Sequence, residues 1–451
     1  MYRKEHDSVG NIDIPKEAYY GVNAQRAVDN FQITKLKLDP LFVESLVEIK
    51  KATAMANMEL GELDIKIGEA IIKAADEMLQ GNLYDQMIVD PIQGGAGTST
   101  NMNINEVLAN RAIELLGGEK GDYTVVSPND HVNKGQSTND VYPSAGKLTF
   151  LKMMDQLLPT LSDLAAAFKV KAEAFKDIKK MGRTQLSDAV PITVGAEFNA
   201  YYVLTKRNIA RLVNVRSEIS SLNMGGTAIG TGISAHNDLP NMVVKHLNSI
   251  TGFDLEVAED LVDGTQNIDC YAVVSDCLKT IALSTSKVAN DIRLLSSGPR
   301  TGLGELFIPS RQNGSSIMPG KINPVIPEVV TQAAFLVAGH NVTISMAVEA
   351  GQLELNAFEP VIFYTMIESF NALTNAFRSF IDNCVIGIEV NEKRCRELLE
   401  RSTYLTTSLA SHIGYDEASS ITKQSLREDK TVLEVAREHG VSESILKQIM
   451  D

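Results

Sequence analysis

The stretch LKMMDQLLPTLSDLAAAFKVKAEAF, residues 151–175, decides the fold of this chain. Its apolar residues recur at alternating intervals of three and four, the spacing of a helix that packs along a narrow seam. Pro159 lies inside this run and should kink the helix locally. The same spacing returns twice downstream, so we expect three long helices with seams at Leu151, Met154, Leu158, Leu161, Ala165, Phe168, Ala172 and Phe175; at Val274, Leu278, Ile281, Thr285, Val288, Ile292 and Leu295; and at Phe363, Met366, Phe370, Leu373, Phe377 and Phe380.

Long helices with narrow seams indicate a helix bundle, and such helices often bury their other apolar faces against further subunits. A monomeric bundle core is the alternative. Shorter helical patterns precede the bundle at 41–63, 65–79 and 104–116, and follow it at 391–398, 415–425, 432–439 and 442–450. We therefore expect a mainly α fold with a mostly helical N-terminal domain at 1–140, a central long-helix bundle at 141–388 and a small helical C-terminal domain at 389–451.

Composition narrows the range of partners. The 451 residues include 42 basic and 57 acidic side chains, a net charge of −15. So acidic a chain is a poor general binder of nucleic acid or of anionic membranes. The four cysteines form no CxxC pair, which favours free thiols in a reducing cytoplasm. The N-terminus is polar, without the apolar core of a signal peptide, and no run approaches ~18 uninterrupted apolar residues.

Four polar segments stand out as candidates for chemistry. GSSIMPGKINP at 314–324 combines two serines, a lysine and an asparagine in a loop punctuated by Gly and Pro before an apolar helix. The others are GTS at 97–99, QSTND at 136–140 and GRTQ at 182–185, each beside an expected helix start. Free N–H groups at a helix start attract anions, although an ordinary N-cap is the alternative for each segment alone. Together they suit a pocket for a small dicarboxylate.

The glycine-rich stretch NMGGTAIGTG at 223–232 is a different case. A dinucleotide loop must follow a strand and open a helix, whereas the residues before this stretch are typical of a helix. We interpret it as a tight turn that exposes backbone N–H groups.

The ordered blocks of the chain resemble the aspartase/fumarase superfamily. The resemblance rests on GSSIMPGKINP together with VDPIQGGAGTSTNMNINEVLANRA, HVNKGQSTNDVYP, MGRTQLSDAVP, NMGGTAIGTG, SSGPRTGLGE and GQLELNAFEPVI. It covers the chain from about residue 12 onward. It implies a three-domain fold whose long helices form the core of a homotetramer, with each site assembled from three subunits. It implies no cofactor and no metal.

Within that superfamily, the chain looks like the ammonia-releasing aspartases. Class II fumarases typically read NPTQCE after the signature, whereas this chain reads NPVIPE at 323–328. Fumarases also place a histidine after GRT, paired with a glutamate that matches Glu328. Gln185 stands here instead, and an amide cannot exchange protons near neutral pH. The remaining candidates are a class II fumarase, another amino-acid lyase of the superfamily, and a non-catalytic relative that kept the fold.

The resemblance also implies roles for individual residues. Ser315 would be the base that removes a proton from L-aspartate, helped by backbone N–H groups and by the cation of Lys321. The carboxylate next to the deprotonated carbon would be held by Thr98, Ser137, Thr138 and Ser316. The other carboxylate would be held by Thr184, Lys321 and Asn323. The leaving amino group would be bound by Asn139 and Gln185, with Glu328 as a supporting residue.

Overall fold

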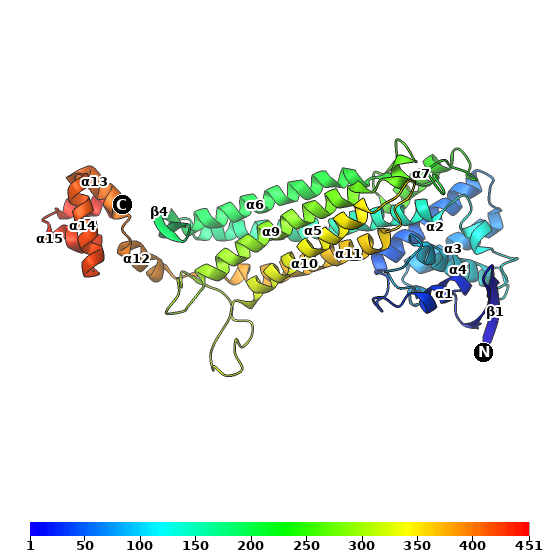
Figure 1. The fold of residues 1–451 in the computed structure, drawn as a ribbon, viewed down its shortest axis with the longest axis horizontal. Coiled ribbons are helices and arrows are strands. Elements are labelled where there is room, and N and C mark those ends of the chain that lie inside the picture. Colours follow the sequence, from blue (N-terminus) through cyan, green and yellow to red (C-terminus); the bar gives the residue numbers. More distant parts are fainter. Residues whose placement is uncertain (451) are drawn as a thin grey trace. The chain divides into compact units, whose positions relative to one another are not determined.

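The computed structural model describes residues 1–450, and the chain divides into two compact units. Unit 1 contains residues 1–158, 210–281 and 335–374, and unit 2 contains 159–209, 282–334 and the chain from 375 onward. Five long helices contribute to both units: α5 (Thr138–Ala174), α6 (Val194–Asn214), α9 (Asp269–Leu295), α10 (Val325–Glu349) and α11 (Glu359–Asn383) (Figure 1). The expected mainly α fold is confirmed, while the three domain boundaries stay a prediction.

The three seams explain why α5, α9 and α11 form. All six seam residues of α11 are at most 2% exposed, and those of α5 and α9 are mostly buried as well. Burying a side chain of this size stabilises the fold by roughly 1.5–3 kcal/mol, so each seam orients a whole helix. Helix α5 continues through Pro159 without a break.

Aromatic side chains form the bundle core within each unit. In unit 1, Phe150 of α5 packs edge-on against Tyr271 of α9 and Phe363 of α11, with ring centroids 5.8 and 5.5 Å away. In unit 2, Phe168 of α5 packs edge-on against Tyr201 of α6 at 5.7 Å and Phe380 of α11 at 6.2 Å. The seam residues of one helix therefore meet aromatic residues of the others in both units.

Shorter elements complete unit 1. They are α1 (Val22–Asn30), α2 (Pro40–Glu59), α3 (Ile65–Leu79), α4 (Thr98–Leu115), α7 (Leu239–Thr251), α8 (Asp263–Gln266), the antiparallel pair β1 (Tyr2–Asp7) and β2 (Gly10–Pro15), and the parallel pair β5 (Ser221–Leu222) and β6 (Glu256–Val257). The segment Pro128–Val132 is a single π-helical turn. The strands were not expected from the sequence, because they are short and lack long alternating patterns.

Helix α4 corrects one expectation, since it begins at Thr98 and not near residue 104. Its first turns hold Asn101, Asn103 and Asn105, which are at most 1% exposed. In the sequence, such a run of asparagines is typical of a polar loop. In the structure each has a partner; Asn103, for example, accepts from the N–H of Ile88 and donates to the carbonyl of Gln86. Buried polar groups with partners are tolerated inside a helix.

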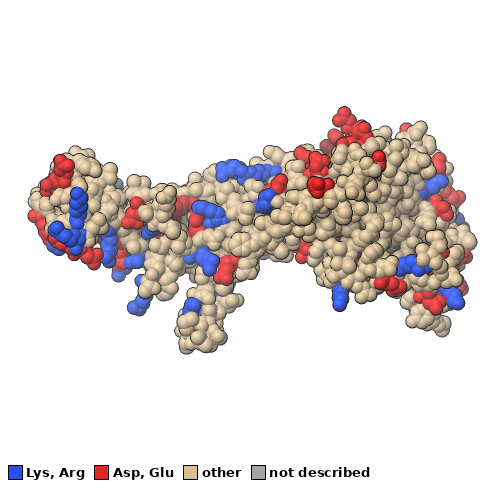
Figure 2. Space-filling view, viewed as in Figure 1, with Lys and Arg blue, Asp and Glu red and all other residues tan. Residues whose placement is uncertain are grey.

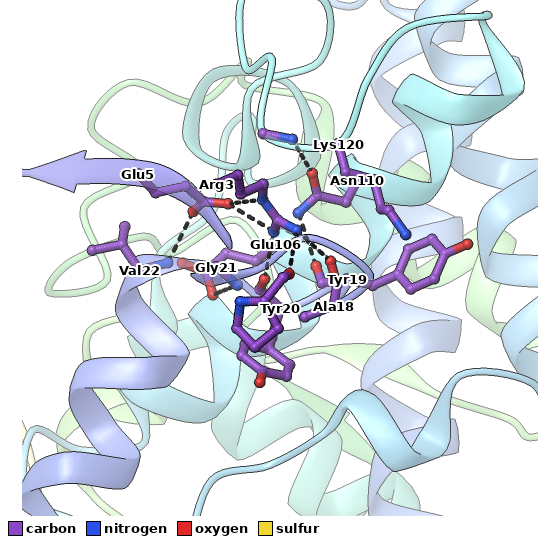
Figure 3. Close-up of polar contacts among 12 residues, drawn as sticks. Arg3, Glu5, Ala18, Tyr19, Tyr20, Gly21, Val22, Glu106, Asn110 and Lys120 are labelled. Carbon is purple, nitrogen blue, oxygen red and sulfur yellow. Dashed lines mark hydrogen bonds and ion pairs between the residues drawn. The ribbon is translucent and has the colours of Figure 1, made fainter. Parts of the chain in front are cut away.

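Helix α4 also holds the N-terminal segment of unit 1 (Figure 3). The fully buried Glu106 accepts from the backbone N–H groups of Gly21 (2.8 Å), Asn23 (2.7 Å) and Ala24 (3.2 Å) at the start of α1. Burial raises the pKa of Glu106 to about 7, although these hydrogen bonds oppose the shift. Glu106 therefore supplies the acceptor that the first turn of α1 lacks.

Unit 2 adds two strand pairs and the C-terminal helices. These are the hairpin β3 (Lys179–Thr184) and β4 (Ser187–Thr193), the pair β7 (Leu306–Phe307) and β8 (Glu389–Val390), and α12 (Glu392–Arg401), α13 (Leu405–Ile413), α14 (Tyr415–Glu428), α15 (Val432–Glu438) and α16 (Glu443–Met450). Four of these five helices match the expected pieces, and α13 was missed. Helices α13 to α16 share a separate small core that includes Leu405, Leu409, Ile421, Val435 and Leu446.

All four cysteines are free in the structure, as expected, with Cys384 and Cys395 buried and Cys270 and Cys277 half-buried. Burial raises the pKa of each thiol, to about 11 for Cys270 and Cys277 and to about 12 for the other two. Raised pKa values keep these thiols protonated and unreactive. No disulfide, and therefore no cross-link, supports the fold of the described residues.

Helix α10 differs from the other long helices in its apolar composition and in the exposure of its large apolar side chains. By length and composition alone it is apolar enough to cross a membrane, a test that buried core helices of water-soluble proteins also pass. Several of its large apolar side chains are exposed, among them Phe335 (65%), Val342 (59%) and Met346 (68%). This helix therefore presents an apolar face that residues 1–450 leave uncovered.

Candidate active site

The structure places the predicted site residues in two groups. Thr98, Ser137, Thr138 and Asn139 belong to unit 1, and Thr184, Gln185, Ser315, Ser316, Lys321, Asn323 and Glu328 belong to unit 2.

The start of α5 in unit 1 is a reciprocal cap. The N–H of Ser137 donates to Oδ1 of Asp140 (2.9 Å), and the hydroxyl of Ser137 accepts from the N–H of Asn139 (3.2 Å). This resembles a capping box with aspartate as the returning acid, except that the serine hydroxyl bonds the second helical residue instead of the third. Because the Ser137 oxygen already accepts a bond, its own proton remains available to donate to a ligand carboxylate.

A buried network of amide side chains holds the hydroxyl of Thr138. Its hydroxyl oxygen accepts from Nδ2 of Asn101 (3.1 Å), which also approaches Oδ1 of Asn133 (3.2 Å). Oδ1 of Asn133 in turn accepts from the amine of Lys50 (2.9 Å), and Oε1 of Gln136 accepts from it as well (3.0 Å). The network leaves the Thr138 proton free and orients it before any ligand arrives.

Lys50 is the buried cation of this network. It is 0% exposed and its partners are two neutral amides. Burial lowers its pKa to about 7, and the charge of Asp140 opposes that shift. Burial raises the pKa of Asp140 to about 6, although backbone donors and Lys50 oppose it. When Lys50 carries its proton, its positive charge next to neutral donors supplies local attraction for an anion, which the net charge of −15 cannot supply.

Thr98 already makes a hydrogen bond to the residues just before it, and its role at the substrate stays a prediction. It stands at the first position of α4, but its hydroxyl donates to the carbonyl of Gly95 (2.7 Å). Its proton is therefore already used, and the oxygen can only accept. For Thr98 to donate to a substrate carboxylate, this bond to Gly95 must break or the hydroxyl must rotate.

In unit 2, the segment between α9 and α10 is a long loop that stands away from the ends of both helices (Figure 1). At its base the N–H of Gly314 donates to the carbonyl of Lys321 (2.7 Å), and Nδ2 of Asn323 donates to the carbonyl of Gly314 (2.8 Å). A Cβ on Gly314 would lie 2.7 Å from that Lys321 oxygen, so this close approach requires glycine. The side chains of Ser316 and Lys321 are exposed.

Two backbone N–H groups point at the hydroxyl of Ser315, whose role as the base stays a prediction. Its hydroxyl oxygen accepts from the N–H groups of Ile317 (3.2 Å) and Met318 (3.0 Å). Two backbone dipoles aimed at one oxygen stabilise negative charge on it. On the face shown in Figure 2, the long loop between α9 and α10 carries mainly uncharged side chains.

Thr184 and Gln185 lie at the turn of a hairpin and not at a helix start, which corrects the expectation for the GRTQ segment. Both central turn residues, Gln185 and Leu186, have positive φ (54° and 65°). A two-residue turn of this kind matches strand twist but normally uses Asn-Gly, and each non-glycine residue costs about 1–2 kcal/mol. Such strain persists only where the surroundings hold it.

A buried ion cluster holds this hairpin. The fully buried Glu305 accepts two bonds from the guanidinium of Arg183 (3.1 and 2.9 Å) and lies 3.2 Å from the amine of Lys180. Lys180 also pairs with Glu197 of α6 (2.8 Å). Removing one member would leave a buried charge unpaired, a loss of about 3–5 kcal/mol. The cluster thus fixes the strand that ends at Thr184.

Comparison with known proteins identifies the family. Residues 10–339 match the family described as Lyase, and residues 405–451 match the family described as Fumarase C C-terminus. A curated aspartate ammonia-lyase from Bacillus sp is 48% identical over 450 residues, covering 100% of this chain and 96% of that protein. This chain belongs to the lyase family. The expected superfamily is therefore confirmed.

Solved structures agree with the fold of this lyase. A structure described as fumarate lyase:delta crystallin from Brucella melitensis bound to cobalt has a TM-score of 0.97 at 46% identity and covers 100% of this chain and 98% of that chain. A class II fumarase from Schistosoma mansoni has a TM-score of 0.92 at 34% identity, covering 98% and 96%. Because both superimpose well, the fold alone does not separate the two reactions.

In the single chain of this lyase, Glu328 lies near a different residue from its expected partner Gln185. Glu328 lies in the first turn of α10, where its charged partner is Arg293 at 3.9 Å. Within residues 1–450, no hydrogen bond joins Glu328 to Gln185. The pairing of these two positions stays a prediction.

Sequence reasoning missed the residues that fix the site residues in place. Lys50, Asn101, Asn133 and Arg183 received no role, because each lies inside a segment whose apolar pattern or motif had another explanation. The signal for Lys50 was weak, because the charged residues Glu48 and Lys51 also stand beside it in α2, although Lys50 alone of the three is 0% exposed. The partners of the amides are far apart in the chain, so no local pattern marks them.

Proposed function

We propose that this lyase releases ammonia from L-aspartate, reversibly, to give fumarate. The observation that carries the proposal is the oxygen of Ser315, which receives two backbone N–H groups in a loop shaped by Gly314 and Asn323. Relatives named aspartate ammonia-lyase support the same reaction, with 48% identity over the whole chain. The class II fumarase reaction is the second candidate, and the lower identity of 34% and Gln185 both weigh against it.

The reaction begins with removal of a proton from the carbon next to one carboxylate. As a base, the Ser315 alkoxide takes this proton, and the electron pair moves into the carboxylate to form a dianionic enediolate. The charge of that intermediate is the main barrier, and donors that already point at it lower the barrier by roughly 2.7–4 kcal/mol each. Ser137 and Thr138 are such donors, since their oxygens already accept bonds and their protons remain free.

The intermediate then collapses to fumarate. The electron pair returns to form the carbon–carbon double bond, and the carbon–nitrogen bond breaks. The amino group is protonated in the substrate, so it leaves as neutral ammonia without a separate acid. Ammonia then takes up the proton held by Ser315 and leaves as ammonium, which balances the reaction. Asn139 and Gln185 bind the amino group, while Thr184, Lys321 and Asn323 hold the second carboxylate and Ser316 joins the donors around the first.

We further propose that the sites form in a homotetramer, where several subunits contribute to each pocket. The exposed apolar face of α10, with Phe335, Val342 and Met346, supports burial against other copies of the chain. Sedimentation of the purified protein at several concentrations tests this proposal, and a monomer at all of them would contradict it. Four free cysteines support a reducing cytoplasm as the location.

One experiment separates the two candidate reactions. The purified enzyme is incubated with fumarate and ammonium in one vessel and with fumarate alone in another, and the products are identified by chromatography. We expect aspartate in the first vessel and no malate in either. Malate without aspartate would contradict the proposal and favour the hydratase.

A further inference from the structure

We propose that the loop 223–232 of unit 1 is a positioning element that fixes the amide of Asn139 with its carbonyl oxygen toward the substrate, and so makes this subsite accept an ammonium group. This inference rests on the proposed function, because Asn139 is there the residue that binds the leaving amine. The sequence analysis interpreted this loop as a tight turn with exposed N–H groups, without a role in the reaction.

The orientation of Asn139 follows from one contact. Its side-chain nitrogen Nδ2 lies 2.7 Å from the main-chain carbonyl oxygen of Ala228. A carbonyl oxygen can only accept, so the amide must turn its NH₂ group toward Ala228 and its oxygen away. Among residues 1–450, none donates to that Asn139 oxygen. An ammonium group has donors alone and a positive charge, so a fixed carbonyl oxygen suits it and an NH₂ group would not.

The backbone of Asn139 is held as firmly as its side chain. Its carbonyl accepts from Nδ2 of Asn223 (2.9 Å), the first residue of the loop. The same Asn223 nitrogen lies 3.0 Å from the hydroxyl of Thr265, and the whole Asn223 side chain is buried. The loop thus grips Asn139 at two points, one on the main chain and one on the side chain.

Asp140 completes a ring of contacts between the loop 223–232 and the start of α5. Its second oxygen accepts from the N–H groups of Gly225 (3.2 Å) and Thr227 (3.0 Å), and the residue is 0% exposed. Asp140 directly follows Asn139, and Ala228 directly follows Thr227. The carboxylate therefore holds the loop at the point where the Ala228 carbonyl meets the Asn139 amide.

The conformation of Thr227 indicates that the loop keeps its position next to Asn139 at a cost in stability. It is a β-branched residue with φ of +56°, a conformation that such residues rarely adopt. It is only 5% exposed, and its hydroxyl has no hydrogen-bond partner. Strain and an unsatisfied buried group usually mark a position that serves function. A residue present only for stability would avoid both.

Thr227→Gly separates positioning from stability. Glycine adopts positive φ freely and removes the unsatisfied hydroxyl, so we expect an unchanged or higher melting temperature. A looser loop lets the amide rotate, so the KM for ammonium in the amination direction should rise about tenfold, the effect of one lost hydrogen bond of ordinary strength. The KM for fumarate should stay within about twofold, because Ser137 and Thr138 keep their own partners.

Asp140→Asn tests the ring from its other side, and Glu106→Gln is the matched control. Glu106 is also a buried carboxylate of unit 1 that accepts three backbone N–H groups, but its partners are at the start of α1 and not in the loop 223–232. Asp140→Asn should lower the melting temperature and raise the KM for ammonium more than that for fumarate. Glu106→Gln should lower the melting temperature and leave the ratio of the two KM values unchanged.

Two results would overturn the inference. One is a pair of KM values that rise together, or stay unchanged, in both loop variants. The other does not depend on turnover: a crystal structure of the Thr227→Gly variant in which Asn139 keeps a single, unchanged contact with the Ala228 carbonyl. If the wild-type enzyme forms no aspartate from fumarate and ammonium, the proposed function fails instead, and the crystallographic result still decides the inference.

Discussion

The segment 136–140 at the start of α5 and the loop 314–323 before α10 carry similar polar side chains, yet the structure treats them in opposite ways. In the first segment, Ser137, Thr138 and Asn139 each have partners that fix their orientation, and Asp140 is fully buried beside them. In the second, the hydrogen bonds lie at the base of the loop and at Ser315, while Ser316 and Lys321 are exposed.

In the proposed reaction, this difference separates two tasks. Donors that are oriented before the substrate arrives need no reorganisation when charge develops, which is what stabilisation of an enediolate requires. A loop with few contacts to the rest of the unit has low local stability and is able to move as ligands enter and leave. Substitutions in the loop should therefore change chemistry without changing stability, whereas substitutions in the first segment should change both.

The largest expected effect is that of Ser315→Ala. Loss of the base should lower kcat by about 10³-fold, within the range typical of a general base. The melting temperature and the oligomeric state should not change, because Ser315 bonds only to neighbours in its own loop. Initial rates from fumarate absorbance, thermal melting and size-exclusion chromatography measure the three quantities. Near-normal turnover would remove Ser315 as the base.

A smaller effect is expected from Thr138→Val, with Ser316→Ala as its counterpart in the loop. Valine keeps the shape of threonine but leaves the buried Asn101 amide without one acceptor, which should lower the free energy of unfolding by about 1–3 kcal/mol. The KM for aspartate should rise as well. Ser316→Ala should weaken substrate binding. Because Ser316 is exposed, its loss should change the free energy of unfolding by no more than about 0.5 kcal/mol. Equal stability losses in both variants would contradict the contrast between the segments.

The smallest effect concerns the pH dependence of stability. Lys50 has a pKa of about 7 in the folded chain against an ordinary value of 10.5. Between these values the unfolded chain binds a proton that the folded chain lacks, so stability rises with pH in this window. The full cost of the buried charge is present below pH 7. Relative to Lys50→Met, the wild-type protein should therefore gain on the order of 2 kcal/mol from pH 7 to pH 9.

Chemical unfolding at the two pH values measures this difference. The matched control is Lys51→Met, because Lys51 is the next residue of α2 but reaches Asp76 near the surface. Its stability should follow the same pH slope as that of the wild type. A difference between wild type and Lys50→Met that stays constant from pH 7 to pH 9 would show that Lys50 does not titrate in this range.

Much of the fold could be predicted from periodicity. The seams that contain Leu151, Val274 and Phe363 gave α5, α9 and α11, because a helix repeats its buried face along the sequence itself. The start of α4 and the hairpin at Gln185 could not be predicted in this way. In α4 the buried asparagines depend on partners elsewhere in unit 1, and at Gln185 a strained turn depends on the ion cluster around Glu305.

The sequence by itself determined the long helices α5, α9 and α11, the chemical types of the candidate site residues and the membership in the lyase family. All three depend on the local sequence, either on spacing along a helix or on contiguous motifs. Only the tertiary structure decided which atoms of those residues are free to act. The Asn139 amide meets the carbonyl of Ala228, and Lys50 meets Asn133, across long stretches of chain. A hydrogen bond depends on the positions of two atoms in space, so its direction is set when distant segments pack together.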